Sequence, residues 1–132
     1  MENIKMLNLN SVMLNSSDYQ KLADFYGEVL QKKPDMEDKE HSAIGYLAGN
    51  CFLSVCSHDK IHGKSQNPER IIFFFETDEV ENEFNRIKNI PGASVIKEPY
   101  KINGSADMGI ATLADPDGNY LQLVTPWKAE TR

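Results

Sequence analysis

The sequence lacks several features that would each indicate a particular kind of protein. Its 132 residues include only two cysteines, too few for a small fold held together by disulfide bonds. No apolar run approaches the roughly 20 residues that a membrane-spanning helix needs. The N-terminal residues also lack the apolar stretch of a signal peptide. These absences favour a soluble, cytoplasmic protein with no membrane partner.

Positive charge is also scarce. Lys and Arg together number 14 against 20 Asp and Glu, which gives a net charge of −6. Because no basic run is present either, the chain is not expected to bind nucleic acid through the phosphate backbone. The 40% apolar and 26% charged fractions are typical of a globular domain. The length predicts a single domain over residues 1–132.

Hydrophobic periodicity predicts a mixture of strands and helices. Strands are expected at 9–15, 43–47, 51–56, 71–75, 93–97, 108–113 and 120–124, with polar loops at 57–70 and 99–107. Helical stripes follow Ser17 and Asp78, each of which precedes a Gln or Glu by three residues, as in a capping box. The apolar run at 71–75 predicts a strand that is buried on both faces.

The predicted elements repeat. Both halves of the chain run from a strand through a capped helix to further strands, and the endings GNCFLSV (49–55) and GNYLQLV (118–124) align. This order predicts an α+β fold of two βαβββ modules, at about 7–60 and about 68–128, with one helix packed on each sheet.

Two stretches resemble a known superfamily over residues 7–127. The first predicted helix, DYQKLADFYGEVL, and the final hairpin, DPDGNYLQLV, are similar to those of glyoxalase, bleomycin-resistance and extradiol-dioxygenase proteins, also called the vicinal oxygen chelate superfamily. The resemblance implies that the two modules form a curved mixed sheet around a cleft. It does not specify the chemistry, since the superfamily contains lyases, epimerases, dioxygenases and antibiotic binders without catalysis.

Catalytic members carry metal ligands at four cleft-facing strand positions. The resemblance places these positions at Ser11, Leu53, Ile72 and Gln122. Alternation along the strands predicts that these four share one face, and that the opposite face packs on the helices with Val12, Leu14, Phe52, Ile71, Phe73, Leu121 and Leu123. Leu53 and Ile72 have no donor atom, and the other two are weak neutral ligands. We therefore expect no metal and no cofactor there.

A second group of residues, Cys51, Cys56, His58 and His62, has a spacing that superficially resembles a zinc-binding motif. The two cysteines are five residues apart on one predicted strand, so their side chains are expected on opposite faces. The two histidines fall in a polar loop. We interpret these residues as two ordinary thiols and two solvated imidazoles.

Two side chains on the predicted cleft face are weak catalytic candidates. Glu76 shares that face with Phe74, where burial would raise the pKa of its carboxyl group and suit it to proton transfer. A solvated carboxylate at the end of the strand is the favoured alternative. Tyr120 could donate a hydrogen bond to a ligand or simply cover the edge of the core.

The predicted ligand-binding residues combine apolar and neutral polar side chains: Ser11, Met13, Asn15, Leu53, Ile72, Phe74, Tyr120, Gln122 and Trp127. The large apolar members could equally be hydrophobic core. Such a lining suits a moderately polar organic ligand. We interpret the chain as a metal-free binder of an antibiotic or metabolite.

Three further questions stay open at this point. The chain could instead be a glyoxalase-like lyase, an isomerase or a dioxygenase with a non-standard site that uses Glu76 or Tyr120, or an interaction module without a ligand. The resemblance implies a homodimer and leaves open whether the modules are exchanged between the two chains. The segment 99–107 could close over the cleft.

Overall fold

A computed structural model describes residues 6–102 and 108–126 of the chain. The first half contains β1 (Ser11–Ser16), α1 (Tyr19–Leu30), β2 (Met36–Asp38), β3 (Ala43–Ala48) and β4 (Cys51–Ser57). The second half contains β5 (Phe73–Glu76), α2 (Val80–Ile87), β6 (Ser94–Lys101), β7 (Gly109–Ala114) and β8 (Tyr120–Val124). The same βαβββ order therefore occurs twice, as predicted.

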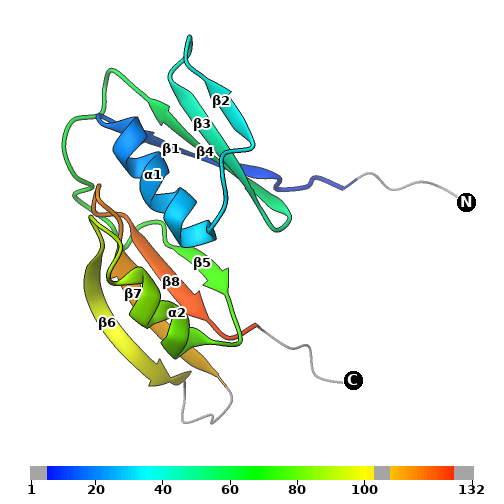
Figure 1. The fold of residues 1–132 in the computed structure, drawn as a ribbon, viewed down its shortest axis with the longest axis vertical. Coiled ribbons are helices and arrows are strands. Elements are labelled where there is room, and N and C mark those ends of the chain that lie inside the picture. Colours follow the sequence, from blue (N-terminus) through cyan, green and yellow to red (C-terminus); the bar gives the residue numbers. More distant parts are fainter. Residues whose placement is uncertain (1–5, 103–107, 127–132) are drawn as a thin grey trace, which may run out of the picture.

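The two halves form two separate mixed sheets, with strand orders β1-β4-β3-β2 and β5-β8-β7-β6. In each sheet the first and last strands of the half pair in parallel, and the remaining pairs are antiparallel. We call β1–β4 with α1 the first module and β5–β8 with α2 the second module. Figure 1 shows the modules one above the other, each with its helix on the same side of the molecule. The predicted α+β class and two-module arrangement are confirmed.

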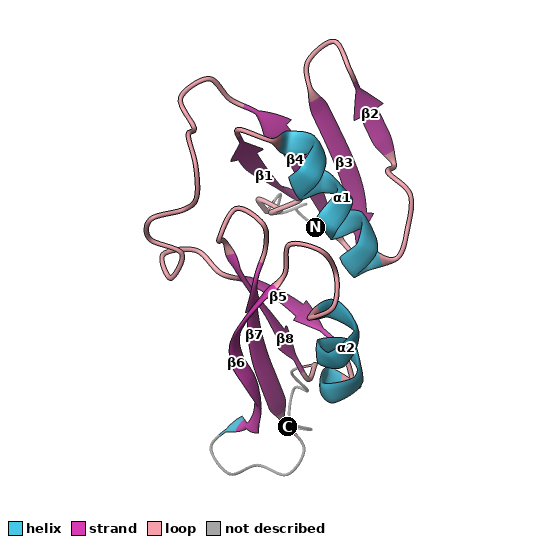
Figure 2. Ribbon diagram, turned by 60° about the vertical axis from the view of Figure 1, so that its left-hand side comes forward, coloured by secondary structure: helices cyan, strands magenta, loops and turns pink. Residues whose placement is uncertain are grey.

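One hydrophobic core extends through both modules. The inner stripe of α1, which includes Leu22, Phe25 and Tyr26, is almost completely buried. The same cluster contains residues of α2 and of β7 and β8. The ring of Tyr26 lies 6.3 Å, between centroids, from that of Phe75 in β5. Figure 2 shows how α1 and α2 lie on the shared side of the two sheets.

Both predicted capping boxes are wrong by one residue. The N-cap of α1 is Asp18, whose side chain accepts a hydrogen bond from the Lys21 N–H at 3.3 Å. The N-cap of α2 is Glu79, which makes no side-chain cap bond, while the Thr77 hydroxyl accepts from its N–H. Short polar side chains such as Thr77 bond nearby backbone groups in several patterns, so spacing alone does not identify the cap.

The strands differ from prediction in two places. β2 was not predicted, since three residues are too few for a periodic signal. β6 continues through Pro99, which was predicted in a loop. Because β6 is an edge strand with two register shifts, a proline there costs no internal ladder bond. The rest of that predicted loop, 103–107, lies outside the described residues.

The apolar run at 71–75 is not buried on both faces. Within a single chain the side chains of Ile71 and Phe74 are 65% and 60% exposed, whereas Phe73 and Phe75 pack against the core. Within β5, Phe73 and Phe75 lie on the covered face and Phe74 on the open face, while the exposed Ile71 precedes the strand. Neither described helix is long and apolar enough to span a membrane.

Candidate functional site

Each sheet has one face covered by its helix and one open face. In the first module the strand register places β1 and β4 residues in pairs that share the open face: Ser11 with Phe52, Met13 with Ser54 and Asn15 with Cys56. Met13 is 60% exposed there. The alternate residues Leu14 and Val55 lie on the covered face, in the core with α1.

The open face of the second module is built around Gln122. This residue pairs with Phe74 of β5 on one side and with Thr112 of β7 on the other. Its Nε2 atom donates a hydrogen bond to the Thr112 hydroxyl at 3.1 Å. Thr112 is buried, while Phe74 remains open to solvent. Tyr120 and Glu76 lie on the same face by strand alternation.

The prediction that Leu53 faces the cleft is wrong. Leu53 pairs with Val12 and Tyr46 on the covered face and is 6% exposed in the core. The neighbouring Phe52, predicted to pack on a helix, lies on the open face instead. Its ring lies over Gly45, where an added Cβ would come within 2.4 Å of the ring.

The turns explain this error. β3 and β4 are joined through 49–50, whereas β7 and β8 are joined through the longer segment 115–119. The length of a hairpin connection sets the strand register, and a shift by one residue exchanges the two faces. The segments 49–55 and 118–124 therefore align in sequence, but Leu53 lies on the covered face of its sheet and Gln122 on the open face. Ser54, which pairs with Met13 as Gln122 pairs with Phe74, is the equivalent position in the first module.

The other candidate residues lie as follows. Ile72 directly precedes β5 and is half-buried. Glu76 ends β5 and is exposed, in agreement with the favoured solvated interpretation, and Tyr120 is half-buried at the start of β8. Trp127 lies outside the described residues.

Only part of the predicted lining contributes to a crevice in the single chain. A crevice of about 340 Å³ lies between β1 and the segment 65–73, and Met13 and Asn119 are among its lining residues. Ser11, Phe74 and Gln122 do not line it. The predicted residues thus form two groups, one on each open sheet face.

Sequence reasoning missed two residues of these faces, Ser54 and Thr112. The signal for Thr112 was present, because it is the only hydroxyl residue in β7, GIATLA. Its importance depends on the antiparallel pairing with β8, which a single strand does not reveal.

The family's metal positions do not fit a metal in this chain. With Ser54 in place of Leu53, the four positions offer two hydroxyls, one amide and one hydrocarbon, and no imidazole, carboxylate or thiolate. Across residues 6–102 and 108–126, no group of three or more His, Cys, Asp or Glu side chains could hold a metal ion. Cys51 and Cys56 are free thiols on opposite faces of β4, and burial raises the pKa of the Cys56 thiol.

A buried hydrogen bond connects the modules. The Tyr26 hydroxyl of α1 donates to Asp115 Oδ2, in the turn before β8, at 2.7 Å. Desolvation raises the pKa of the Asp115 carboxyl group, despite the hydrogen bonds that act in the opposite direction. Burial, together with the nearby Asp115 charge, also raises the pKa of Tyr26 well above its ordinary value.

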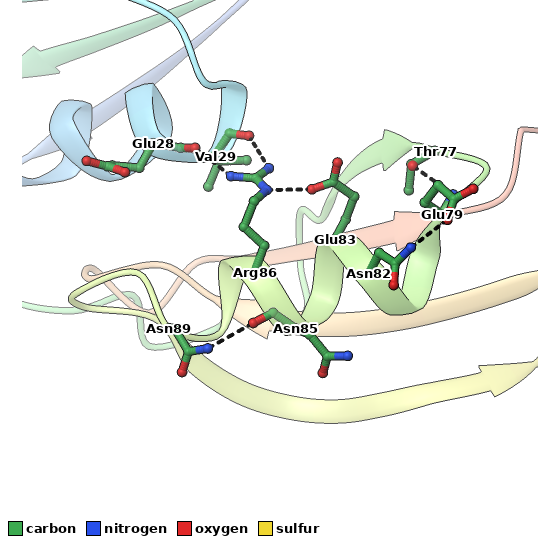
Figure 3. Close-up of polar contacts among 9 residues, drawn as sticks. All are labelled: Glu28, Val29, Thr77, Glu79, Asn82, Glu83, Asn85, Arg86 and Asn89. Carbon is green, nitrogen blue, oxygen red and sulfur yellow. Dashed lines mark hydrogen bonds and ion pairs between the residues drawn. The ribbon is translucent and has the colours of Figure 1, made fainter.

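Arg86 of α2 makes a second connection (Figure 3). Its Nη1 and Nη2 atoms donate to the backbone carbonyls of Glu28 and Val29, at the end of α1, at 2.9 and 2.8 Å. Its Nε atom donates to Glu83 at 2.6 Å. The guanidinium group thus adds two hydrogen bonds to carbonyls of the last turn of α1, where helix geometry leaves acceptors without intrahelical partners. Together with Asp115, it positions one open face relative to the other.

The chain has two paired βαβββ modules, and each sheet has one face covered by a helix and one open face. This arrangement is the fold of the glyoxalase, bleomycin-resistance and dioxygenase class of proteins. The chain belongs to the Glyoxalase-like domain family, whose sequence model matches residues 11–124. The superfamily that the two stretches resembled is therefore confirmed. None of the curated proteins matches the chain.

Solved structures share the fold at low sequence identity. A glyoxalase-related enzyme from Fulvimarina pelagi superposes with a TM-score of 0.75 at 17% identity, over 96% of this chain and 94% of that chain. The fosfomycin resistance protein FosX from Listeria monocytogenes gives 0.65 at 18% identity, over 97% and 96%. A glyoxalase/bleomycin resistance protein/dioxygenase family enzyme from Burkholderia phytofirmans gives 0.70 at 18%, over 90% and 98%. These likenesses concern the fold alone.

Proposed function

We propose that this chain binds a small organic molecule on its open sheet faces without a metal ion. The main support is the set of possible metal ligands in this chain. The family's metal positions are occupied by Ser11, Ser54, Ile72 and Gln122. None of these can offset the dehydration of a divalent cation as imidazole or carboxylate does. Leu53 is removed from the predicted lining, since it belongs to the core.

The remaining side chains suit an organic ligand. Met13 and Phe74 offer open apolar surface, and Ser11, Asn15 and Gln122 offer neutral hydrogen-bonding groups. Ligand sites commonly combine such apolar surface with a few polar groups. The fosfomycin resistance and bleomycin resistance names among the structural neighbours support an antibiotic as the ligand, with a metabolite as the alternative.

We further propose that the binding unit is a homodimer in which a second copy covers the open faces. Several large apolar side chains near β1 and β5 are exposed in the single chain, among them Met13, Ile71 and Phe74 at 60%, 65% and 60%. Where such side chains form one contiguous patch, the patch commonly marks an interaction site. Sedimentation or light scattering should give twice the chain mass, and Met13→Glu with Phe74→Glu should give monomers. A monomeric parent protein would contradict this arrangement.

Two measurements test the binding proposal. Metal analysis of protein purified without chelator should find no stoichiometric transition metal, and one ion per chain would overturn the metal-free claim. A thermal-shift screen of antibiotics and metabolites should identify stabilising compounds, since a ligand at 100 times its Kd adds about 2.7 kcal/mol. Met13→Ala and Gln122→Ala should abolish the shift, while the exposed control Lys39→Ala should retain it.

The same experiments distinguish the alternatives. A flat response over a broad library would favour an interaction module without a ligand. Turnover of a stabilising compound, lost in Glu76→Gln or Tyr120→Phe, would favour an enzyme. The cytoplasmic location and the lack of nucleic-acid binding stay predictions from the sequence.

A further inference from the structure

The open face of the second module has a polar row across its middle. Strand pairing places Lys97, Thr112, Gln122 and Phe74 next to one another on β6, β7, β8 and β5. The ammonium group of Lys97 lies over the ring of Tyr100, 5.2 Å from its centroid. This places a cation at one edge, an aromatic ring at the other, and the Thr112–Gln122 hydrogen bond between them.

Thr112 is a rigid partner for the Gln122 amide. It lies on a central strand, is only 6% exposed, and carries a β-branched side chain with few rotamers. Gln122 is half-buried on β8 and has a longer, more mobile side chain. A hydrogen bond of 3.1 Å from Gln122 Nε2 to the Thr112 hydroxyl therefore fixes the amide and leaves the threonine unchanged.

In this arrangement the amide nitrogen is the atom next to Thr112, and the carbonyl oxygen is left free of it. A glutamine amide has two N–H donors and one carbonyl oxygen, and here the nitrogen is bonded to Thr112. Within the described part of the chain, no buried side-chain nitrogen or oxygen lacks a partner. Among the described residues, Gln122 Oε1 makes no hydrogen bond, and Gln122 itself is only half-buried. The centre of the face thus presents a hydrogen-bond acceptor beside the open ring of Phe74.

We propose that Thr112 is a positioning residue that holds the Gln122 carbonyl oxygen toward the ligand. The face is then selective for an aromatic or apolar group bearing a hydroxyl or amine donor, and it discriminates against the same group bearing only acceptors. This inference rests on the proposed ligand-binding function. It adds the chemical class of the ligand and a residue that determines it.

The first experiment requires no ligand. In ¹⁵N-labelled protein, the two Nε2 protons of Gln122 should have well-separated shifts, and the bonded proton should exchange slowly. Thr112→Val removes the hydroxyl at nearly constant volume and should bring the shifts together and speed exchange. Thr112→Ser should stay close to the parent. Ser54→Ala, which removes a hydroxyl from the other open face, should leave Gln122 unchanged. An unaltered Gln122 amide in Thr112→Val would overturn the proposal.

The second experiment measures selectivity with benzyl alcohol and benzyl methyl ether, which differ in the donor. Titrations followed at Phe74 and Gln122 should show the alcohol binding about fivefold more tightly, the effect of one neutral hydrogen bond. Thr112→Val should reduce this ratio to near one, and Thr112→Ser should restore it. Circular dichroism and thermal unfolding establish that each variant is folded.

The outcomes separate the two proposals. Equal binding of both probes to the parent, or an unchanged ratio in Thr112→Val, would overturn the role of Thr112 in selectivity. If neither probe shifts a resonance on the open face, the proposed function fails there. The positioning of the Gln122 amide is then decided by the ligand-free measurement alone.

Discussion

The two modules share one topology but differ in how their open faces are built. In the first module the ring of Phe52 covers Gly45, and the Ser11 hydroxyl donates to its neighbour Asn10 and not to a partner across the sheet. In the second module Thr112 and Gln122 form a bonded pair at the centre of the face. Strand order is therefore conserved between the halves, while the side chains of each face are set independently.

The helices differ as well. The 12-residue α1 is capped by Asp18 at its start and receives Arg86 at its end, whereas the 8-residue α2 has no side-chain cap bond at its N-terminus. Arg86 of the shorter helix, α2, donates the hydrogen bonds to the last carbonyls of the longer helix, α1. The modules consequently depend on each other, and variants at the junction should destabilise both.

The largest effect is expected from breaking the junction at Asp115. Its carboxylate accepts hydrogen bonds from the N–H groups of Asp117 and Asn119, in addition to the one from Tyr26. Asp115→Ala leaves the buried Tyr26 hydroxyl and the part-buried N–H groups of Asp117 and Asn119 without this acceptor, and it should lower the free energy of unfolding by about 3 kcal/mol or more. Urea denaturation measures the loss.

Asp115→Asn is the matched control. The oxygen of the new amide can still accept from the N–H groups of Asp117 and Asn119, and its nitrogen can donate to the Tyr26 hydroxyl. It should cost less than half as much as Asp115→Ala. Equal losses in the two variants would show that the hydrogen bonds contribute little.

Next in size is a test of the two faces of β4. Leu53→Ala removes a core side chain and should cost about 2–4 kcal/mol. Phe52→Ala on the open face should cost less than about 1 kcal/mol in the unliganded protein. Comparison of the two unfolding midpoints in urea checks the assignment. A larger loss of stability for Phe52→Ala than for Leu53→Ala would support the sequence-based assignment, with Phe52 on the covered face and Leu53 on the open face.

A smaller effect is expected from Arg86. Arg86→Met keeps the aliphatic stem but removes both bonds to the α1 carbonyls, and should cost about 1–2 kcal/mol. Glu83→Gln removes only the partly exposed ion pair and should cost less than about 1 kcal/mol. Thermal unfolding and hydrogen exchange at the end of α1 follow both variants. Faster exchange in Glu83→Gln than in Arg86→Met would contradict this order.

The smallest predicted effect is a pH dependence at Asp115. Its pKa in the folded protein is raised above the ordinary value of 3.8 by desolvation. The stability that this group contributes is therefore fully present below pH 3.8 and is lost as the pH rises through the folded pKa. Unfolding measured from pH 3.5 upward should show this loss in the parent and not in Asp115→Asn. Parallel pH curves for the two proteins would disprove it.

Local patterns predicted most of the elements correctly. The stripe of Leu22, Phe25 and Tyr26 indicated α1, and the repeated order of elements indicated two modules. The capping residues were placed one residue away, and β2 and the length of β6 were missed. Helix caps and edge strands depend on single hydrogen bonds and on neighbouring strands, which periodicity does not report.

The candidate site was predicted less completely. Met13, Phe74 and Gln122 do lie on open faces, but Leu53 was assigned to the wrong face and Thr112 was not considered. The error at Leu53 arose because two similar endings follow turns of different length. Register depends on pairing between strands, so an alignment of one strand with another cannot determine it.

The sequence by itself determined the repeated element order and the amphipathic helices, because each is a property of residue type and local spacing. Only the tertiary structure decided the direction of Leu53, the Thr112–Gln122 bond and the connections between modules. Tyr26 and Asp115 are 89 residues apart in the chain, and Arg86 is 57 residues from Val29. Contacts over such separations form only when the sheets and helices have packed, so no local pattern contains them.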